Sequence, residues 1–484
     1  MSNTPSGISG IAVHVPPFRV DLQSWCDWTG ADPGKIRDVV GTGFRLPGPQ
    51  QSVYTMAANA VLQLIDKYDV DTSRVRFLAL GTESSTDNSA GAVITKGMVD
   101  DALRQKGQAP LARNCEVPEF KHACLGGVYA IKNALRFLQT DGRDAQAIVV
   151  CSDIAVYEPG SSGEPTQGSG AVAILLENNP AIATLDLQQS GNASDYRVVD
   201  FRKPIQYSNG DGKTYACSNV PVFNGPYSAS CYVDELLCAL EDMYERRGLD
   251  AHTYISDLEA VFMHRPFKRM PENGWGMAYL FSLQGEHSDE LRSYADAAGV
   301  DFAELQAEMT NRPHLSEYGV QERIDEDVFP LVNKVLRAFR RQPAYAERVT
   351  GKMRLGAEQM EELGNLYTGA LPAWLAAGLE QATNEGTELS GREVLLFGYG
   401  SGDAAEALPM TLVSGWEQAA AKIGVAESMS NAVDLDESQY RALRKGVRID
   451  LDFAPQAEFI VDRVGGETAD DFQDKGIEYY RYID

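Results

Sequence analysis

Short apolar runs that end in glycine-rich or polar turns recur along the chain. Such runs occupy residues 75–80, 147–151, 171–176, 258–263 and 394–397. Largely continuous apolar stretches of this length are typical of strands that are buried on both faces. The pattern therefore predicts a sheet that is covered by helices on both sides.

Helical patterns lie between the predicted strands. In residues 54–68 the apolar side chains form a stripe at helical spacing, and residues 128–138 repeat this pattern. Strand–turn–helix units of this kind predict the α/β class. In that class functional groups gather where loops converge at the carboxyl ends of the strands.

Four of the turns that follow predicted strands carry a reactive or hydrogen-bonding side chain. These residues are Glu83, Asp153, His264 and Ser401. Chance explains a single residue of this kind. Four such residues at equivalent positions indicate a shared site at one edge of the sheet.

The length of 484 residues suits a large α/β body built from two halves. Polar residues that follow the run at 171–176 predict a boundary near residue 190, with halves 1–190 and 191–484. A charged helical stretch that includes residues 322–341 predicts a helical insertion over about 270–360 in the second half.

Composition and charge exclude several classes of protein. The chain has 43 Lys and Arg against 69 Asp and Glu, a formal charge of −26, which argues against a nucleic-acid-binding face. No apolar run reaches the roughly 18 residues of a membrane span, and residues 1–17 lack the pattern of a secretory signal. Seven cysteines without a C-x-x-C pair argue against a zinc ribbon or a redox dithiol. We therefore expect a cytoplasmic protein with reduced thiols and no membrane or nucleic-acid partner.

Cys124 is the candidate nucleophile. It lies immediately before the predicted helix that begins near Val128, and Ala123, Gly126 and Gly127 around it leave room for a substrate to approach the backbone. A thiol at a helix N-terminus is near unpaired N–H groups and the positive end of the helix dipole, which favour the thiolate. The alternative is a buried structural cysteine at a tight helix start.

Glu83 and His264 are candidates for proton transfer. Each follows a predicted strand, and Pro266 ends the element that carries His264. A carboxyl group among apolar strand ends has a raised pKa and can act as acid and base by turns. An imidazole is a suitable partner for a cysteine nucleophile. Taken alone, a glutamate in the position of Glu83 is more often a turn or helix-cap carboxylate, and a lone histidine such as His264 is more often structural.

Two further segments offer hydrogen-bond donors. The Asn365 amide can donate to a substrate carbonyl, although a helix cap is the alternative. Residues 398–402, Gly-Tyr-Gly-Ser-Gly, follow a predicted strand and offer backbone N–H groups near Ser401. The sequence contains none of the H-E-x-x-H, Walker or EF-hand patterns, so we expect neither a metal nor a nucleotide cofactor.

Several motifs, taken in order, resemble those of the 3-hydroxy-3-methylglutaryl-CoA synthase family in the thiolase superfamily. The resemblance extends from the strand before Glu83 through Ser401, and the order Glu, Cys, His, Asn is its most specific part. Ketoacyl synthases are similar around the cysteine and histidine but lack this glutamate. The motifs are Gly81-Thr82-Glu83, Ala123-Cys124-Leu125-Gly126-Gly127, Ser152-Asp153-Ile154-Ala155-Val156-Tyr157, residues 163–173, His264-Arg265-Pro266-Phe267, Gly364-Asn365-Leu366-Tyr367-Thr368 and Tyr399-Gly400-Ser401-Gly402.

The resemblance implies a five-layered αβαβα fold of two duplicated halves, a homodimer, and coenzyme A thioesters as substrates. Cys124 would take an acetyl group from acetyl-CoA, and Glu83 would remove a methyl proton from the acetyl-thioester. His264 would bind the carbonyl of acetoacetyl-CoA. After carbon–carbon bond formation, water would release 3-hydroxy-3-methylglutaryl-CoA (HMG-CoA). The predicted substrate-binding residues are Asp153, Thr166, Arg269, Asn365 and Ser401.

The chain also departs from the family pattern. Leu125 follows the cysteine where many members have Tyr, Asn224 replaces an expected Asp, and Arg269 replaces an expected Lys. Because CoA is an anion and the chain is acidic, local cations are expected to receive its phosphates. The candidates for this role are Arg202, Lys203, Lys268 and Arg269.

Two alternatives stay open at this stage. A polyketide β-branching synthase of the same family would use substrates carried on an acyl carrier protein, and would need a basic docking patch for that acidic partner. A non-catalytic scaffold of the same fold would not need the cysteine, glutamate and histidine together. The charge of −26 lowers the odds of the first, and the presence of all three side chains disfavours the second.

Overall fold

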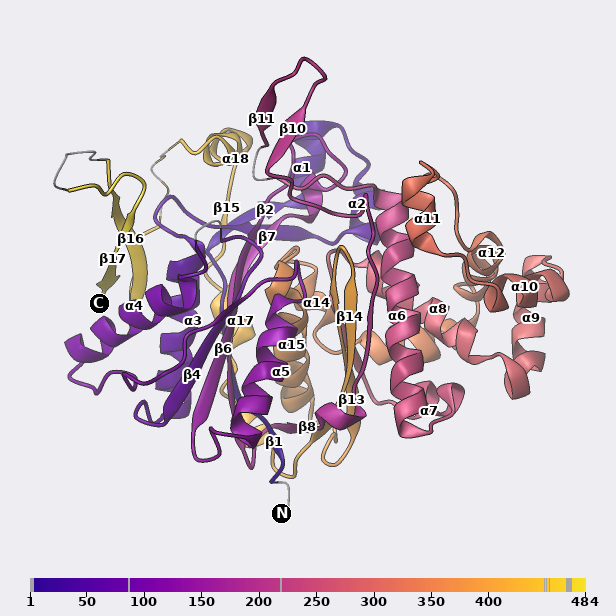
Figure 1. The fold of residues 1–484 in the computed structure, drawn as a ribbon, viewed down its shortest axis with the longest axis horizontal. Coiled ribbons are helices and arrows are strands. Elements are labelled where there is room, and N and C mark those ends of the chain that lie inside the picture. Colours follow the sequence, from indigo (N-terminus) through magenta and orange to yellow (C-terminus); the bar gives the residue numbers. More distant parts are fainter. Residues whose placement is uncertain are drawn as a thin grey trace.

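A ten-stranded mixed sheet runs through the centre of the molecule (Figure 1). The computed structural model describes residues 4–85, 88–217, 220–447, 449, 451, 453–466 and 472–484. The sheet has the order β12-β13-β14-β8-β1-β7-β6-β4-β5, and β9 pairs with β14. Its strands are β1 (Ser6–His14), β4 (Val75–Gly81), β5 (Glu119–Phe120), β6 (Gln146–Ala155), β7 (Gly168–Asn178), β8 (Ala183–Leu185), β9 (Gly191–Ser194), β12 (Val261–Met263), β13 (Glu393–Gly400) and β14 (Ala404–Leu412).

Smaller sheets and hairpins surround this central sheet. They are formed by β2 (Phe18–Asp21), β3 (Gly43–Leu46) and β15 (Val433–Asp434), by β10 (Gln206–Ser208) with β11 (Thr214–Ala216), and by β16 (Glu458–Val464) with β17 (Glu478–Ile483). The β10–β11 and β16–β17 hairpins project from the body at its top and left in Figure 1.

The helices begin and end as follows. They are α1 (Leu22–Thr29), α2 (Pro33–Val39), α3 (Val53–Tyr68), α4 (Gly91–Gln105), α5 (Gly126–Gln139), α6 (Gly225–Arg247), α7 (Ala251–Asp257), α8 (Arg269–Ser282), α9 (Ser288–Ala298), α10 (Phe302–Thr310), α11 (Leu315–Val320), α12 (Pro330–Phe339), α13 (Pro343–Tyr345), α14 (Ala357–Met360), α15 (Ala370–Glu385), α16 (Glu417–Ala420), α17 (Val425–Met429) and α18 (Glu437–Arg444).

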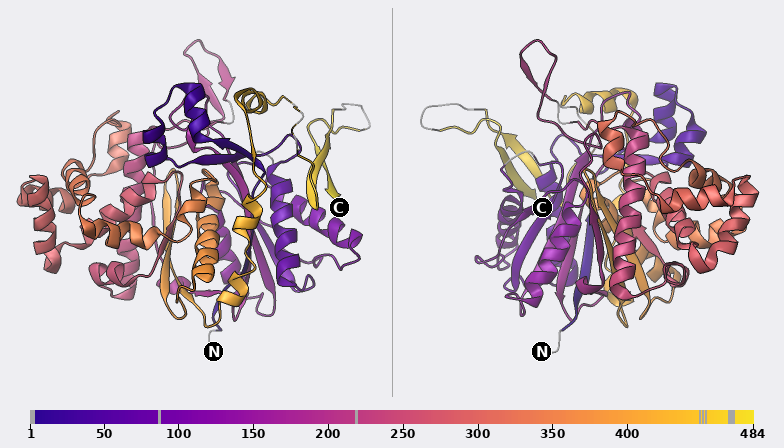
Figure 2. Two further views of the ribbon diagram at one scale, coloured as in Figure 1. Left: turned by 180° about the vertical axis from the view of Figure 1, so that it is seen from behind. Right: turned by 45° about the vertical axis from the view of Figure 1, so that its right-hand side comes forward.

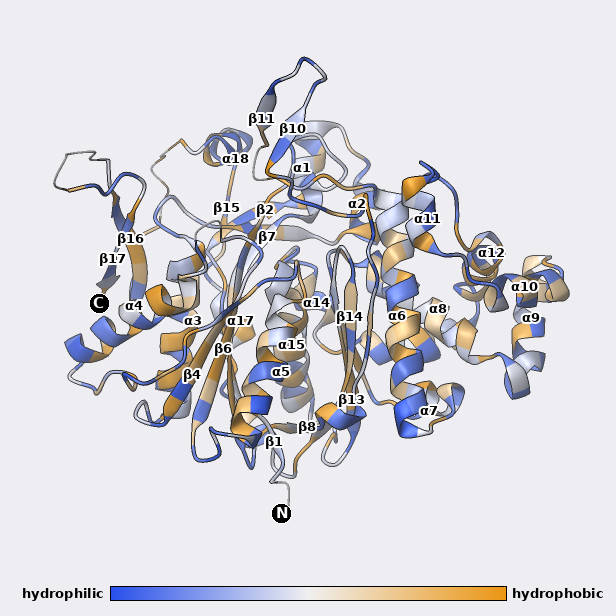
Figure 3. Ribbon diagram, viewed as in Figure 1, coloured by the Kyte–Doolittle hydropathy of each residue, from blue (hydrophilic) through white to orange (hydrophobic). Residues whose placement is uncertain are grey.

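The predicted apolar strands are buried on both faces. In β4, Leu78 and Leu80 pack in the cluster with α3 and α4, whereas Phe77 and Ala79 pack in the cluster with α5. Consecutive strand residues point to opposite faces, so both faces must be apolar when helices cover both. Figure 3 shows β4 and β6 as largely hydrophobic. The prediction of a helix-covered sheet is confirmed.

One predicted strand is shorter than expected. Of the apolar run at 258–263 only Val261–Met263 forms β12, because α7 extends to Asp257 and the chain turns before the strand begins. The strand still pairs in parallel with β13, with Met263 opposite Phe397. His264 therefore emerges at the end of β12 as predicted.

The stretch between β12 and β13 is helical. It contains α8 to α15, and α9 to α12 form a lobe at one side of the body that both views of Figure 2 also show. This lobe is not only a charged surface, because Val332, Val335, Leu336 and Phe339 of α12 are buried. The segment predicted to be helical is helical. Its interpretation as an insertion and the division of the chain at residue 190 stay predictions.

No helix in the described ranges combines the length and the apolar composition that a membrane crossing requires.

Candidate active site

Cys124 and Glu83 meet at one end of the sheet. Glu83 lies in the turn after β4, and Cys124 lies just before α5. The Cys124 thiol donates a hydrogen bond from Sγ to Glu83 Oε2 at 3.3 Å. The thiol is buried, with 9% of Cys124 exposed. Sequence analysis predicted both residues at this site, and the structure brings them into direct contact.

Two glycines allow this contact. A Cβ atom on Gly81 would lie 2.6 Å from the Cα of Gly127, and a Cβ atom on Gly127 would lie 2.4 Å from Sγ of Cys151. The end of β4 and the start of α5 therefore approach more closely than side chains would permit. This close approach carries the turn with Glu83 toward Cys124.

Asp153 organises the loops around Glu83. Its Oδ1 accepts hydrogen bonds from the Glu83 N–H at 2.8 Å, the Ser84 N–H at 3.0 Å and the Thr82 hydroxyl at 3.1 Å. Its Oδ2 accepts bonds from the N–H and the hydroxyl of Thr368. Asp153 is fully buried. These contacts make it a residue that positions Glu83, and its predicted contact with substrate stays a prediction.

The cysteine rests as a thiol in this environment. Burial raises the pKa of Cys124 well above its ordinary value, and the nearby carboxylates of Glu83 and Asp153 raise it further. The expectation that the helix N-terminus would stabilise a thiolate is therefore wrong for the resting site. Desolvation and two negative neighbours outweigh the helix dipole, so the thiol proton needs an acceptor.

Glu83 is the acceptor within reach of that proton. Burial raises the pKa of its carboxyl group, while the Lys203 ammonium acts in the opposite direction. Lys203 Nζ lies 3.2 Å from Glu83 Oε1. Sequence analysis grouped Lys203 with cations for CoA phosphates, whereas the structure pairs it with Glu83. Sequence spacing could not reveal this contact because the two residues are far apart along the chain.

His264 lies at the same end of the sheet, on the far side of β13. Its backbone N–H donates to the Phe397 carbonyl at 2.7 Å, and its ring stacks on Tyr399 with centroids 6.3 Å apart. Its Nδ1 is buried without a hydrogen-bond partner among the described residues. Burial lowers its pKa to about 3, so the imidazole is neutral near pH 7 and can donate a hydrogen bond but not act as a cation.

The backbone near the end of β13 connects His264 to the cysteine loop. A Cβ atom on Gly400 would lie 2.5 Å from the carbonyl oxygen of His122 and 2.7 Å from Leu125 Cβ. The Gly400 backbone thus packs against the residues that flank Cys124. Ser401 follows in the turn to β14 and is half-buried. Its predicted contact with an acyl group stays a prediction.

Asn365 and Thr166 lie next to Tyr157, which is buried in one cluster with Cys124. The Asn365 amide donates from Nδ2 to the Tyr157 hydroxyl at 3.2 Å, and its Oδ1 accepts from the Tyr367 N–H at 2.8 Å. The Asn365 N–H donates to the Thr166 carbonyl at 3.0 Å. Asn365 retains one amide hydrogen for a substrate, because Nδ2 carries two.

Aromatic rings enclose Cys124. Tyr157 and Tyr367 are buried with it in one cluster, and Phe201 and Phe223 pack against that cluster. Ring centroids are 5.8 Å apart for Tyr157 and Phe223 and 6.0 Å apart for Phe201 and Tyr367. Sequence analysis did not assign these residues a role, although Tyr157 and Tyr367 lie within quoted motifs. The rings form apolar walls that suit a small acyl group and limit water.

The three residues that depart from the family pattern contact nearby protein residues. Arg269 begins α8, where it pairs with Glu272 at 3.2 Å and donates to the Asp38 carbonyl at 3.1 Å. Asn224 immediately precedes α6, and its side-chain amide donates to the Val199 carbonyl at 2.6 Å. Leu125 is fully buried against β13. The predicted role of Arg269 at a CoA phosphate stays a prediction.

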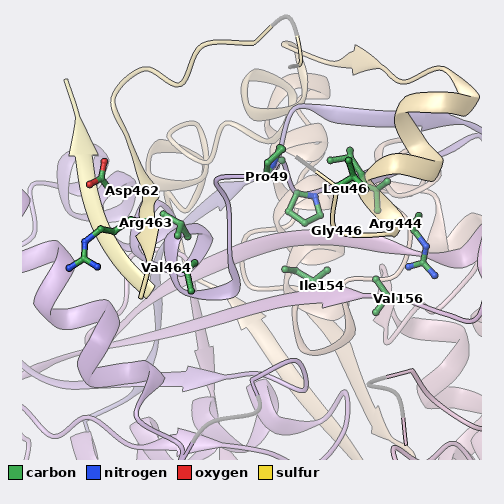
Figure 4. A pocket seen from close by; sticks show the side chains of 14 residues that line it. Leu46, Pro49, Ile154, Val156, Arg444, Gly446, Asp462, Arg463 and Val464 are labelled. Atoms are coloured by element: carbon green, nitrogen blue, oxygen red, sulfur yellow. The ribbon is translucent and has the colours of Figure 1, made fainter. Parts of the chain in front are cut away.

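A separate cavity of about 460 Å³ opens on the other face of β6 (Figure 4). Ile154 and Val156 line it, whereas Asp153 and Tyr157 of the same segment face the site of Cys124. Alternate residues of an extended strand point to opposite sides. This cavity is therefore distinct from the cysteine site.

In the described part of the chain, no group of three or more His, Cys, Asp or Glu is arranged to hold a metal ion.

Comparison with known proteins agrees with this fold. Solved structures of similar fold include MvaS in complex with 3-hydroxy-3-methylglutaryl coenzyme A, at 24% identity with a TM-score of 0.76 over 99% of both chains. The HMG synthase of the curacin biosynthetic pathway, in complex with holo donor-ACP, has a TM-score of 0.71 at 19% identity, covering 99% of this chain and 100% of the other. These neighbours define the class as an α/β protein of thiolase-like fold, which confirms the fold class predicted from sequence.

Two family models match the chain. One describes the hydroxymethylglutaryl-coenzyme A synthase N terminal and matches residues 3–181, and the other describes the C terminal and matches residues 200–442. The chain belongs to the hydroxymethylglutaryl-CoA synthase family. The synthase of Enterococcus faecalis is 28% identical over 90% of this chain and 91% of its own length. The synthase of Saccharomyces cerevisiae is 25% identical over 93% and 84%.

Proposed function

We propose that the protein is a hydroxymethylglutaryl-CoA synthase, an acyltransferase that condenses acetyl-CoA with acetoacetyl-CoA. The observation that carries this proposal is the contact between Cys124 Sγ and Glu83 Oε2 at 3.3 Å. It places a nucleophile and its proton acceptor together in a buried, aromatic-walled site. Membership of the synthase family supports the same reaction.

Acetyl transfer begins at Cys124. The thiol proton passes to Glu83 as the sulfur attacks the acetyl carbonyl, and Glu83 returns this proton to the leaving CoA sulfur, so that CoA departs as the thiol and Glu83 is again a carboxylate. This order follows from the raised pKa of Cys124, because a buried thiol attacks only when a base removes its proton. The products of this step are acetyl-Cys124 and free CoA.

Condensation uses the same carboxylate again. Glu83 removes a proton from the methyl group of acetyl-Cys124, and the resulting carbanion attacks C3 of acetoacetyl-CoA. The C3 oxygen then takes the proton from Glu83. Neutral His264 donates a hydrogen bond to this oxygen as negative charge develops there. Water finally cleaves the thioester and releases HMG-CoA and the free thiol.

Asn365, Ser401 and Thr166 would orient the acyl groups, and Arg269 would contact the CoA moiety. Arg269 is partly exposed at the start of α8, where its ion pair with Glu272 leaves further N–H groups for a phosphate. No resident metal or cofactor enters this scheme, since the carbanion is stabilised by hydrogen bonds and the thioester itself. We further propose a cytoplasmic homodimer that acts in the mevalonate pathway.

One assay tests the reaction. Purified protein is mixed with acetyl-CoA and acetoacetyl-CoA, and free CoA and HMG-CoA are measured. Wild type should form both, Cys124→Ser should not form the acyl-enzyme, and Glu83→Ala should lose condensation. Condensation that persists in Cys124→Ser would contradict the scheme.

The same assay separates the two carriers. Acetyl groups are supplied on CoA in one arm and on an acyl carrier protein in the other. The charge of −26 favours the CoA arm, because carrier proteins are themselves acidic. Turnover with the carrier-bound substrate alone would identify a β-branching synthase instead.

A further inference from the structure

Lys203 brings a positive charge to Glu83 from a segment that is distant along the chain. Its Nζ lies 3.2 Å from Glu83 Oε1, and the side chains of Lys203 and Glu83 are 18% and 7% exposed. The other carboxylate oxygen, Oε2, accepts the Cys124 thiol hydrogen bond. Glu83 thus has an ammonium group on one oxygen and the nucleophile on the other.

Backbone hydrogen bonds of the neighbouring residue and an aromatic ring hold Lys203 in its position. The neighbouring Arg202 exchanges two backbone hydrogen bonds with Val222, at 2.9 and 2.8 Å, which fixes this extended segment. The ammonium group also lies 4.6 Å from the centroid of the Tyr367 ring. A cation over a partly desolvated aromatic face is attracted to it. The ammonium group therefore lies in a defined place beside the carboxylate.

We propose that Lys203 is a positioning residue that keeps Glu83 ionised, so that Glu83 can take the proton of Cys124. This inference rests on the proposed function only for the second role of Glu83, which is removal of a proton from the acetyl-thioester. The transfer from thiol to carboxylate needs no acyl substrate. It can therefore be tested apart from the condensation.

The charged and titratable groups around Glu83 indicate in which direction removal of Lys203 would change the pKa of Glu83. The elements packed against it contribute the Cys124 thiol, the Asp153 carboxylate, the Tyr157 and Tyr367 hydroxyls, and Lys203. Burial and Asp153 raise the pKa of Glu83, and Lys203 lowers it. Removal of Lys203 leaves the Cys124 hydrogen bond to lower this pKa against burial and Asp153. Glu83 would then hold its own proton more strongly and accept one from sulfur less readily.

The test is the pH dependence of Cys124 alkylation by iodoacetamide in the full chain. Alkylation is followed by mass spectrometry of the peptide that carries Cys124, for wild type, Lys203→Met and Lys203→Arg. We expect the midpoint of the Lys203→Met profile to move up by about one pH unit or more, with about tenfold slower alkylation at pH 7. Lys203→Arg should keep the midpoint close to that of wild type, because it restores the charge.

Controls make each outcome decisive. Lys213→Met removes an exposed lysine from the turn of the β10–β11 hairpin and should leave the profile unchanged. If Lys203→Met does not fold, Lys203→Gln is used, with thermal unfolding as the check. Overlapping profiles for wild type and a folded, neutral Lys203 variant would overturn the proposal.

A second arm measures acetyl transfer and condensation over the same pH range. Lack of acyl-CoA turnover in wild type, together with a shifted alkylation profile in Lys203→Met, would contradict the proposed function and retain the role of Lys203. Turnover without the shift would do the reverse. The two failures are therefore distinguishable.

Discussion

The backbone N–H of Glu83 donates a 2.8 Å hydrogen bond to Oδ1 of Asp153. The same carboxylate holds Ser84 and Thr368, so a single buried side chain ties the turn after β4 to the segment that follows Asn365. The position of the Glu83 carboxyl group next to Cys124 depends on this tie. Loss of the Asp153 charge should therefore affect both the stability of the fold and the geometry of the site.

Replacement of Asp153 by Asn tests this dependence. An amide would turn an N–H donor toward groups that are themselves donors, and we expect a loss of about 2–4 kcal/mol in the free energy of unfolding. Condensation should fall at least about tenfold, because misplacing a catalytic group slows the reaction steeply. Urea denaturation and steady-state kinetics measure the two effects. Asp211→Asn, in an exposed turn, is the control, and equal effects of both variants would contradict the assignment.

The glycine at the start of α5 gives a second prediction. Gly127→Ala would place its Cβ atom 2.4 Å from Sγ of Cys151 and 3.1 Å from the Thr368 carbonyl oxygen. We expect a loss of about 1–3 kcal/mol in the free energy of unfolding, typical of overpacking. Urea denaturation is the measurement.

Two further variants sharpen this test. Gly97→Ala, in the middle of α4 with nothing within 4 Å of the added Cβ atom, should be neutral or should stabilise by up to about 1 kcal/mol. The double variant Gly127→Ala, Cys151→Ala removes the sulfur and should recover part of the loss. Full additivity of the two substitutions would show that the Cys151 contact is not the cause.

Phe223 is expected to restrict the acyl group on Cys124. Its ring lies in the wall with Tyr157 and Phe201. Phe223→Ala should raise the ratio of propionyl to acetyl transfer by about tenfold, since one methylene in a tight pocket is worth about 1–3 kcal/mol. Intact mass of the acyl-enzyme after incubation with each CoA ester measures the ratio. Val222→Ala, at the exposed neighbouring position, is the control. The same ratio of propionyl to acetyl transfer in both variants would contradict the prediction.

Buried His264 should make stability depend on pH. Its pKa is about 3 in the folded protein, against an ordinary value of 6.5. Below pH 6.5 the unfolded chain binds a proton at this position that the folded protein does not, so stability is lost as the pH falls. The loss between pH 7 and pH 5 should be about 2 kcal/mol for this one group.

Comparison with His264→Gln isolates that contribution. Urea denaturation of wild type and variant at pH 7 and pH 5 should show the stability difference shifting by about 2 kcal/mol in favour of the variant at the lower pH. His314→Gln removes an exposed histidine and serves as the control for loss of a surface imidazole. A stability difference for His264→Gln that is constant with pH would contradict a neutral, buried imidazole.

Arg269 is predicted to contact the CoA moiety. Arg269→Glu would place a carboxylate beside Glu272 and repel the CoA phosphates. KM for the CoA substrates should rise far more than kcat falls, because the contact is the same in the ground state and the transition state. Steady-state kinetics with Arg354→Glu, another ion-paired arginine of the helical segment, gives the control. Equal changes in kcat and KM would remove Arg269 from the binding site.

The sequence alone determined the central strands, the helices between them, and the place of Glu83, Cys124 and His264 at the ends of their elements. These features depend on local patterns, because a strand covered on both faces must be apolar over consecutive positions. The full apolar run before His264 was a poor guide to strand length, since its first residues, 258–260, form the connection between α7 and β12.

Only the tertiary structure decided the state of the cysteine and the partners of the glutamate. The helix start near Cys124 favoured a thiolate, but burial and the carboxylates of Glu83 and Asp153 keep the thiol protonated. Lys203 contacts Glu83 although it lies 120 positions later in the chain. Desolvation and charge–charge distances arise only when distant segments pack together, and no local pattern encodes them.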